Sequence, residues 1–345
     1  MTTERADAVS DRGRSERDGR PRTARPDAGQ ATDPVLSFTE VHLSFAGVKA
    51  ISGVSFEVFP SELLAIIGPN GAGKTSIFNV ISGVYRPQRG RVRFGDVDLV
   101  GRHPAEIAAL GVARTFQNIE LFENLTVLDN LMLGRHVHVR YGPLAALVWL
   151  GRARREELRH RAVVEDIVDF LELEQWRRYP VGLLPYGVQK RVELGRALAM
   201  EPKVLLLDEP VAGMNVEETE DTARYVLDIR DELDISIIMV EHDMGVVMDL
   251  ADRVLVVDFG SPITTGTPAE VQEDPNVIHA YLGEEHTVAN ADARPGASPD
   301  GSDGPDGRPA STPEPTRETG SPGPPPAGVA VDVEPSAHDR REGRP

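Results

Sequence analysis

Gly68-Pro69-Asn70-Gly71-Ala72-Gly73-Lys74-Thr75 is the stretch that decides the fold of this 345-residue chain. It matches the pattern G-x-x-x-x-G-K-[ST], in which the backbone N–H groups of a glycine-rich loop surround phosphate groups. The apolar residues 63–67 before it predict a buried strand, and residues 76–81 after it predict a helix. A strand, a phosphate-binding loop and a helix in this order predict a nucleotide site.

Each residue type in this loop has its own part in binding phosphate. The glycines allow the backbone to approach an anion closely, and the N-terminus of the following helix favours negative charge. Lys74 adds a full positive charge near the β and γ phosphates, and Thr75 offers a hydroxyl group to Mg²⁺. A chance glycine-rich turn is the alternative, which the flanking pattern disfavours. The residues that we expect to bind ATP are Gly68, Pro69, Asn70, Gly71, Ala72, Gly73, Lys74, Thr75 and Ser76.

Composition separates a folded region from two polar ends. Residues 1–33 and 284–345 are rich in charged residues, Gly, Pro and Ser, so we predict that both are disordered. The segment between them, 34–283, is long enough for a sizeable core. The C-terminal tail contributes −6 and the N-terminal arm is neutral, which leaves −12 of the net charge of −18 on the folded region. That balance argues against nucleic acid as the main partner.

Any contact with a membrane is expected to go through a partner protein or a surface helix. No apolar run approaches the ~20 residues of a spanning helix, and the strongest candidate, 143–150, is far too short. The N-terminus lacks the apolar centre of a signal peptide. The chain has no cysteine, hence no disulfide and no thiolate metal site. The charged run 152–161 predicts a solvated helix face, with a membrane-surface role as the alternative.

The rest of the folded region alternates between strand and helix patterns. Residues 35–45 and 51–59 predict a small antiparallel sheet, and residues 126–176 are mainly helical. Near-continuous apolar strands separated by helices predict an α/β fold with a mostly parallel sheet covered on both faces. Ligands of such sheets bind at the carboxyl ends of the strands. Further strands are predicted at 91–94, 112–116, 204–207, 235–240 and 254–257, and further helices at 107–110, 189–200, 217–233 and up to 250.

Polar residues that suit ATP hydrolysis follow several of these strands. Asp208 and Glu209 end one strand, and Gln117 and His242 follow two others. We expect Asp208 to join the Mg²⁺ shell, Glu209 to act as general base for the attacking water, and His242 to contact the γ-phosphate. Gln117 is expected to reach Mg²⁺ or the water. Phe45 is a candidate for stacking on the adenine ring or, alternatively, an ordinary aromatic residue of the sheet core.

Taken together, these motifs resemble the ATP-binding-cassette (ABC) ATPases over residues 35–283. The resemblance implies a RecA-like P-loop NTPase core, an antiparallel β subdomain and an inserted helical subdomain, which we expect at about 118–200. The segments that correspond are Walker A at 68–75, the Q-loop at Gln117, the signature at 184–189, Walker B with its glutamate at 204–209, the D-loop at 212–215 and the switch histidine at His242.

Several segments narrow the resemblance to the LivG-type ATPases of branched-chain amino-acid importers. They read RTFQNIELFENLTVLDNL, EPVAGMN, VEHDM and PNVIHAYLG. This likeness implies an ATPase at the cytoplasmic face of the cell membrane that drives import through a separate permease, served by a substrate-binding protein. It also implies a head-to-tail dimer, with a paralogous cassette or a second copy, that holds two ATP molecules between Walker A of one chain and the signature of the other. A groove near residues 117–125 would receive a coupling helix of the permease.

The signature departs from the family's usual L-S-G-G-Q. Pro185 replaces the serine and Tyr186 the first glycine, whereas Gly187 keeps the second. Because proline has neither a hydroxyl group nor an N–H, one contact across the dimer is missing. We therefore expect Tyr186 and Gly187 to keep the nucleotide-binding role with weaker γ-phosphate binding. Asn215 replaces the usual D-loop aspartate, which removes a charge but keeps hydrogen bonding.

Other functions stay open at this point. ATPases for urea or amide uptake or for lipopolysaccharide export would share these motifs, because the permease and binding protein determine the substrate. A soluble ABC protein of translation or DNA repair usually has two fused cassettes or a long coiled-coil insertion, and the insertion here is too short for that. A regulator without hydrolysis is disfavoured by the presence of Glu209 and His242.

Overall fold

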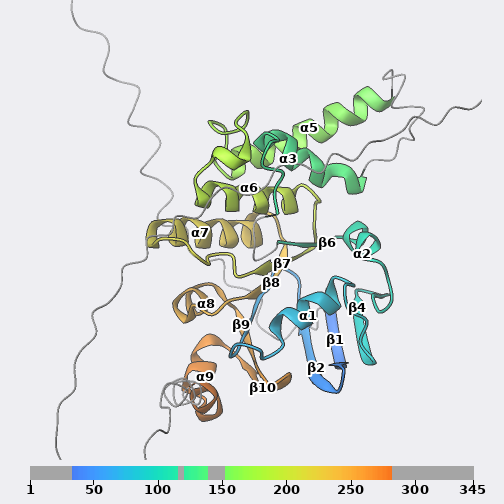
Figure 1. Cartoon of the computed structure of the whole chain (residues 1–345), viewed down its shortest axis with the longest axis vertical. Helices are drawn as coiled ribbons and strands as arrows, with labels where there is room; N and C mark the ends of the chain where they lie inside the picture. The colour runs from blue at the N-terminus through green and yellow to red at the C-terminus, as the bar shows by residue number, and fades with distance from the viewer. Residues whose placement is uncertain (1–32, 116–119, 139–151, 282–345) are drawn as a thin grey trace, which may run out of the picture. The chain divides into compact units, whose positions relative to one another are not determined.

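The computed structural model describes residues 33–115, 120–138 and 152–281 (Figure 1). A six-stranded sheet with the strand order β10-β9-β3-β8-β7-β6 forms its centre. The pairs β9–β3, β3–β8, β8–β7 and β7–β6 are parallel, and only the pairing of β10 with β9 is antiparallel among these described strands. The predicted α/β fold with a mostly parallel sheet is confirmed. The strands are β3 (Leu63–Ile67), β6 (Val112–Arg114), β7 (Val204–Asp208), β8 (Ser236–Val240), β9 (Arg253–Asp258) and β10 (Ser261–Gly266).

A second, four-stranded sheet has the order β2-β1-β4-β5 and is antiparallel, as predicted for the N-terminal part of the fold. The two alternating runs at 35–45 form one strand, because an irregularity in register between Phe38 and Val41 takes up the break in the pattern. Glu40 lies within this irregularity and has a positive φ of 48°. The strands are β1 (Leu36–Phe45), β2 (Val48–Val58), β4 (Arg89–Phe94) and β5 (Val97–Asp98).

Helices cover both faces of the six-stranded sheet. In Figure 1, α6 and α7 lie on one side of β6–β8 with α3 and α5 beyond them, and α1 lies on the other side beside β1 and β2. The helices are α1 (Lys74–Ile81), α2 (Pro104–Leu110), α3 (Val127–Gly134), α5 (Arg152–Phe170), α6 (Tyr186–Leu198), α7 (Val216–Glu232), α8 (Met244–Leu250) and α9 (Pro268–Glu273), with short 3₁₀ turns at Arg135–His138 and Val181–Leu183.

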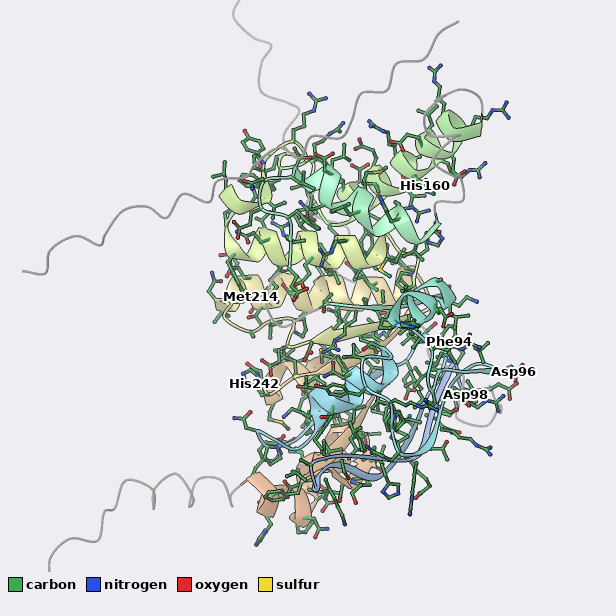
Figure 2. All side chains as sticks on the ribbon, turned by 45° about the vertical axis from the view of Figure 1, so that its right-hand side comes forward. Phe94, Asp96, Asp98, His160, Met214 and His242 are labelled. Atoms are coloured by element: carbon green, nitrogen blue, oxygen red, sulfur yellow. The ribbon has the colours of Figure 1, made fainter. Side chains whose placement is uncertain are left out.

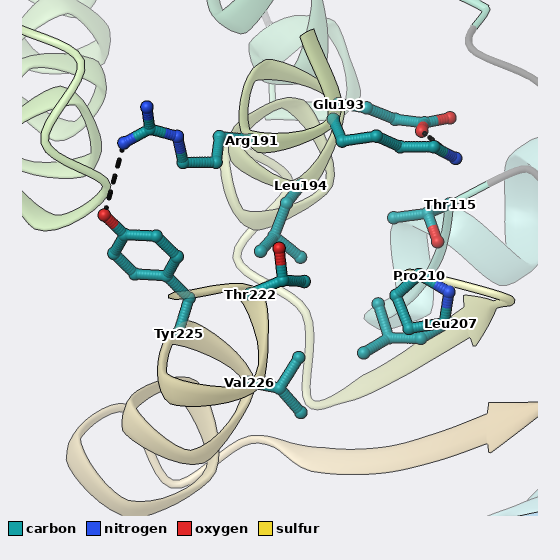
Figure 3. Close-up of a pocket in the computed structure, with 10 residues that line it drawn as sticks. Thr115, Arg191, Glu193, Leu194, Leu207, Pro210, Thr222, Tyr225 and Val226 are labelled. Atoms are coloured by element: carbon teal, nitrogen blue, oxygen red, sulfur yellow. Dashed lines mark hydrogen bonds and ion pairs between the residues drawn. The ribbon is translucent and has the colours of Figure 1, made fainter. Parts of the chain in front are cut away.

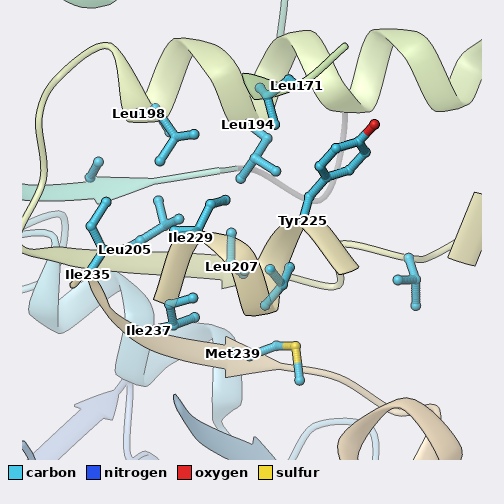
Figure 4. Close-up of a cluster of buried hydrophobic side chains, with 14 of the residues drawn as sticks. Leu171, Leu194, Leu198, Leu205, Leu207, Tyr225, Ile229, Ile235, Ile237 and Met239 are labelled. Atoms are coloured by element: carbon cyan, nitrogen blue, oxygen red, sulfur yellow. The ribbon is translucent and has the colours of Figure 1, made fainter. Parts of the chain in front are cut away.

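The side chains of β3 show why its sequence is apolar without alternation. Leu63, Ala65 and Ile67 pack into the cluster on the helical face, part of which is drawn in Figure 4. Leu64 and Ile66 pack into the cluster on the face of the antiparallel sheet and α1. Because both faces of a strand in a covered parallel sheet are buried, every position favours an apolar residue. Strand β3, which leads into the phosphate-binding loop, is therefore packed on both faces.

Several local features differ from the sequence predictions. Helix α6 begins at Tyr186 instead of 189, directly after Pro185 at its N-cap. Strand β10 and helix α9 were not predicted, although Thr267 and Glu270 form a capping box that marks the start of α9. Helix α5 ends at Phe170, so its pattern does not continue to 176.

The charged run at 152–161 lies on α5, where Arg154, Arg155, Arg159 and Arg161 are exposed, as predicted for a solvated face. Across the described ranges, none of the helices has both the length and the apolar character required to cross a bilayer.

Candidate nucleotide site

Three neighbouring strands bring the predicted motifs to one edge of the sheet. Strand β8 lies between β3 and β7, and Val240 at its end pairs with both Ile66 and Asp208. The strands therefore end level with one another. The phosphate-binding loop follows β3, Glu209 follows β7, and His242 follows β8 on the same side of the described fold as Met214 (Figure 2).

The glycines of the loop are required by close packing. A side chain on Gly68 would collide with the carbonyl oxygen of Val257, and one on Gly73 with the carbonyl oxygen of Ala50. Both glycines also have positive φ angles, 151° and 101°, that other residues rarely adopt. The loop thus rests against β2 and β9 with its backbone tightly turned, which is the shape needed to surround a phosphate.

Lys74 lies at the start of α1 and is 9% exposed. Its Nζ donates hydrogen bonds to the carbonyl oxygens of Gly68, at 2.5 Å, and Pro69, at 2.9 Å. These bonds hold the ammonium group against the loop. Thr75, the next residue, is exposed. The first turn of α1 therefore offers a buried positive charge and an accessible hydroxyl group at a helix N-terminus, where anions are favoured.

Asp208 is held by Arg114, a residue that the sequence analysis did not identify. Arg114 Nη2 lies 2.7 Å from Asp208 Oδ2, and both side chains are less than a tenth exposed. Arg114 Nη1 donates to Asn79 Oδ1 at 2.7 Å, and the guanidinium carbon lies 5.4 Å from the centre of the Phe78 ring. One arginine at the end of β6 thus joins β7 to α1. The sequence did hold one indication of this role, because Arg114 is a single charged residue within the mainly apolar pattern at 112–116.

Glu209 and His242 lie within reach of each other. His242 Nδ1 is 3.9 Å from Glu209 Oε2, and the two side chains are 64% and 21% exposed, respectively. Glu209 has a left-handed backbone with a φ of 49°, which is uncommon for a residue with a side chain, and its N–H donates to the carbonyl oxygen of Val240 at 2.9 Å. This conformation turns the chain sharply directly after Asp208.

The signature and D-loop residues lie side by side in the same chain. The Tyr186 hydroxyl group donates to the carbonyl oxygen of Ala212 at 3.1 Å. Gly187 packs so closely against Glu218 that a side chain at this position would overlap its carboxylate. Asn215 caps α7, and its Oδ1 accepts a hydrogen bond from the N–H of Glu218 at 3.0 Å. Asn215 therefore makes a hydrogen bond, and Glu218 contacts both segments.

Comparison with known proteins identifies the family. Residues 51–212 match the family described as ABC transporter. The chain is 36% identical over 251 residues to the high-affinity branched-chain amino acid transport ATP-binding protein BraF of Pseudomonas aeruginosa, covering 73% of this chain and 98% of that protein. The chain belongs to the ABC transporter ATP-binding family. It is therefore a nucleotide-binding protein and an ATPase.

Further relatives of this ABC ATPase differ in the substrates that their names state. The branched-chain amino acid transport ATP-binding protein LivG of Escherichia coli is 37% identical over 256 residues, covering 73% of this chain and 99% of that protein. The sulfate/thiosulfate import ATP-binding protein CysA of Bradyrhizobium diazoefficiens is 34% identical over 244 residues, covering 70% of this chain and 66% of that protein. Residues 261–287 match the family described as branched-chain amino acid ATP-binding cassette transporter.

The fold of this ABC ATPase agrees with solved cassettes. An ATP-binding cassette of an ABC transporter in its ADP conformation superposes with a TM-score of 0.64 and 33% identity, covering 73% of this chain and 100% of that one. A nucleotide-free cassette from an ABC transporter superposes with a TM-score of 0.63 and 32% identity, covering 72% of this chain and 98% of that one.

The oxygen donors at the site suit Mg²⁺ together with a nucleotide. Mg²⁺ in such sites takes one or two carboxylates and completes its shell with phosphates and water. Asp208 and Thr75 are the carboxylate and the hydroxyl group that the sequence predicts for this role. Within the described residues no group of three or more His, Asp and Glu forms a metal site by itself. The donor set therefore fits a metal that arrives with the triphosphate.

Of the two remaining predicted site residues, the structure describes Phe45 but not Gln117. Phe45 is 45% exposed and makes an edge-to-face contact with Tyr85, with ring centres 5.0 Å apart, so the alternative of an ordinary core aromatic is wrong. Its role in stacking on adenine stays a prediction. Gln117 lies outside the described residues.

A small cavity behind Walker B is not the nucleotide site. It has a volume of about 20 Å³, which is room for roughly one water molecule. Figure 3 shows Thr115, Glu193 and Pro210 around it, with the Arg191–Tyr225 hydrogen bond nearby. A larger cavity of about 240 Å³ lies elsewhere, between α2, the segment after α1, and α6.

Proposed function

We propose that this ATPase energises the import of branched-chain amino acids through separate permease subunits at the cytoplasmic face of the cell membrane. The observation that carries the substrate class is the match of residues 261–287 to the branched-chain amino acid cassette family. Overall identity does not separate the substrates, because CysA, at 34%, is nearly as similar as BraF, at 36%. The C-terminal match is specific to one class, and the names of BraF and LivG agree with it.

The residues at the sheet edge support in-line attack of water on the γ-phosphate. Lys74 offsets phosphate charge, the loop N–H groups donate hydrogen bonds to phosphate oxygens, and Thr75 and Asp208 would hold Mg²⁺. Bound Mg²⁺ would neutralise charge that develops on the phosphate oxygens. Glu209 takes the proton of the attacking water, and His242, 3.9 Å from it, contacts the γ-phosphate. Phe45 would stack on the adenine, and Gln117, which lies outside the described residues, is the predicted contact to the metal or the water.

We further propose that two cassettes close over two ATP molecules, with a paralogous cassette or a second copy as the partner. Tyr186 and Gly187 would then face the phosphates of the partner's nucleotide. In this proposal residues 34–283 form the folded cassette, with the helical subdomain at about 118–200.

The cavity of about 240 Å³ lies beside the residue that holds Asp208. It is lined partly by Val84, Ile107 and Met200, and it also includes Arg114. Arg114 lines this cavity and also binds Asp208, the proposed metal ligand. The expected groove for a permease coupling helix, near residues 117–125, stays a proposal, because residues 116–119 lie outside the described ranges.

Uptake measurements in the native host test the proposal. Deletion of the gene should abolish ATP-dependent uptake of labelled leucine, isoleucine and valine. The wild-type gene should restore uptake, and a Lys74→Ala gene should not. Unchanged amino-acid uptake together with lost uptake of urea or amides, or with defective lipopolysaccharide export, would assign the ATPase to one of those systems. No transport defect of any kind would favour a soluble ABC protein.

A further inference from the structure

One fully buried carboxylate at the catalytic edge takes no part in the proposed chemistry. Glu241 follows β8 and precedes His242, yet its side chain is 0% exposed. A carboxylate is costly to bury unless hydrogen bonds compensate for lost water. Burial raises the pKa of Glu241, and hydrogen bonds from Val211, His242 and Asp243 oppose that rise. Its partners therefore indicate what it holds in place.

The two oxygens of Glu241 bind two different loops. Oε1 accepts a hydrogen bond from the backbone N–H of Val211 at 3.2 Å. Oε2 accepts from the backbone N–H groups of His242, at 3.0 Å, and Asp243, at 3.5 Å. Val211 directly precedes the D-loop at 212–215. One side chain thus joins the start of the D-loop to the loop that carries the switch histidine.

The D-loop is held on its other side by the signature. The Tyr186 hydroxyl group donates to Ala212, and the tyrosine ring lies beside Gly213. Burial raises the pKa of Tyr186, and the carboxylates of Glu193 and Glu218 raise it further, so the hydroxyl group keeps its proton as a donor at neutral pH. A continuous set of contacts therefore runs from the signature through the D-loop to the histidine loop.

We propose that Glu241 is a positioning residue for hydrolysis, which holds the D-loop and the switch histidine in one fixed arrangement and, through the Tyr186–Ala212 bond, links both to the signature. The inference rests on the proposed role of His242. His242 Nδ1 lies 3.9 Å from Glu241 Oε2 and 3.9 Å from Glu209 Oε2, so this histidine lies between the positioning carboxylate and the general base. A shift of the D-loop moves Val211, and Glu241 transmits that movement to His242.

Glutamine cannot replace Glu241 in this arrangement. A carboxylate accepts hydrogen bonds on both oxygens, whereas glutamine has one acceptor oxygen and an NH₂ group. In Glu241→Gln the NH₂ group would face a backbone N–H of one loop and release it. The size of the side chain is nearly unchanged, so the substitution removes the link without opening a cavity.

Steady-state ATP hydrolysis by the full-length chain tests the proposal. Glu241→Gln should lower kcat by about 10-fold or more, the effect of losing a hydrogen bond to a charged group. KM for ATP should stay within about twofold, because the contacts of the phosphate-binding loop are intact. Tyr186→Phe removes only the hydroxyl group of a side chain that is 42% exposed. It should lower kcat by about 2- to 10-fold without changing the melting temperature.

Asp252→Asn provides a matched control at the opposite edge of the sheet. Asp252 also joins two segments, since Oδ2 accepts from the N–H of Leu63 at 2.9 Å and lies 3.4 Å from Arg230 Nη1. This variant should melt at a lower temperature and keep the wild-type kcat. Wild-type kcat in Glu241→Gln, whether or not its melting temperature falls, would overturn the proposal. Should that variant fail to fold, wild-type kcat in Tyr186→Phe would overturn the link. A wild-type chain that hydrolyses ATP without supporting amino-acid uptake contradicts the proposed substrate and leaves this comparison intact.

Discussion

Replacing Arg114 with methionine should destabilise the protein far more than replacing an exposed arginine. The side chains of Arg114 and Asp208 are 9% and 6% exposed, so the substitution leaves a buried carboxylate without its positive partner. Removing one member of a buried ion pair costs about 3–5 kcal/mol. For a domain of this size, each kcal/mol lowers the melting temperature by about 2–4 °C, so the expected fall is roughly 6–20 °C.

Urea unfolding without nucleotide and Mg²⁺ measures this cost apart from any effect on ATP binding. Arg93→Met is the matched control, because Arg93 pairs with Asp96 at 3.6 Å with side chains that are 46% and 108% exposed. That variant should lose less than about 1 kcal/mol, as exposed pairs do. The double variant Arg114→Met/Asp208→Asn should regain much of the loss, because both buried charges are then absent. A loss in Arg114→Met as small as that of the control, or no recovery in the double variant, would refute the reasoning.

Four further outcomes follow from the site and the sequence. Lys74→Ala should abolish ATP binding or hydrolysis; wild-type affinity in calorimetry together with wild-type turnover would contradict the loop assignment. Glu209→Gln should slow hydrolysis by about 10²- to 10⁴-fold, as expected for a lost general base, and accumulate as an ATP-bound dimer detectable by light scattering. Burial raises the pKa of Glu241 in the folded chain, so its contribution to stability should fall as pH rises above the ordinary glutamate range. The free energy of unfolding of Glu241→Gln, relative to wild type, should therefore rise as the pH increases above that range. Deleting 284–345 should leave ATPase activity and the melting temperature nearly unchanged, and a fall of more than a few degrees would show that the tail stabilises the fold.

Local sequence patterns predicted the strands that form the centre of the sheet. The apolar runs at 63–67, 204–207 and 235–240 match β3, β7 and β8 within one residue, because strands buried on both faces leave a pattern that is visible in any short window. The glycine-rich loop was predictable for a similar reason, since its steric requirements act over a few residues.

The contacts that hold the catalytic edge together were not predictable in this way. Arg114 binds Asp208 across 94 positions of sequence and Asn79 across 35. Glu241 and Val211 are 30 positions apart. Nothing in the periodicity of either partner indicates such a pairing, because it depends on which strands become neighbours. The start of α6 at Tyr186 was missed because proline and glycine near a helix start resemble a loop in the sequence.

The place of β3 in the sheet has a consequence for how the chain folds during synthesis. The two neighbours of β3 are β8 and β9, which come from residues 236–240 and 253–258. The strand before the phosphate-binding loop therefore emerges from the ribosome long before either strand that pairs with it, and contacts between distant segments form late. Until β8 has been made, both edges of β3 are unpaired, and the edge that pairs with β9 stays unpaired until residue 258 has been made. Unpaired edges of an apolar strand are sites at which other chains can bind. We therefore expect the nascent chain to depend most on chaperones after the Walker A loop has been translated and before β9 pairs with β3.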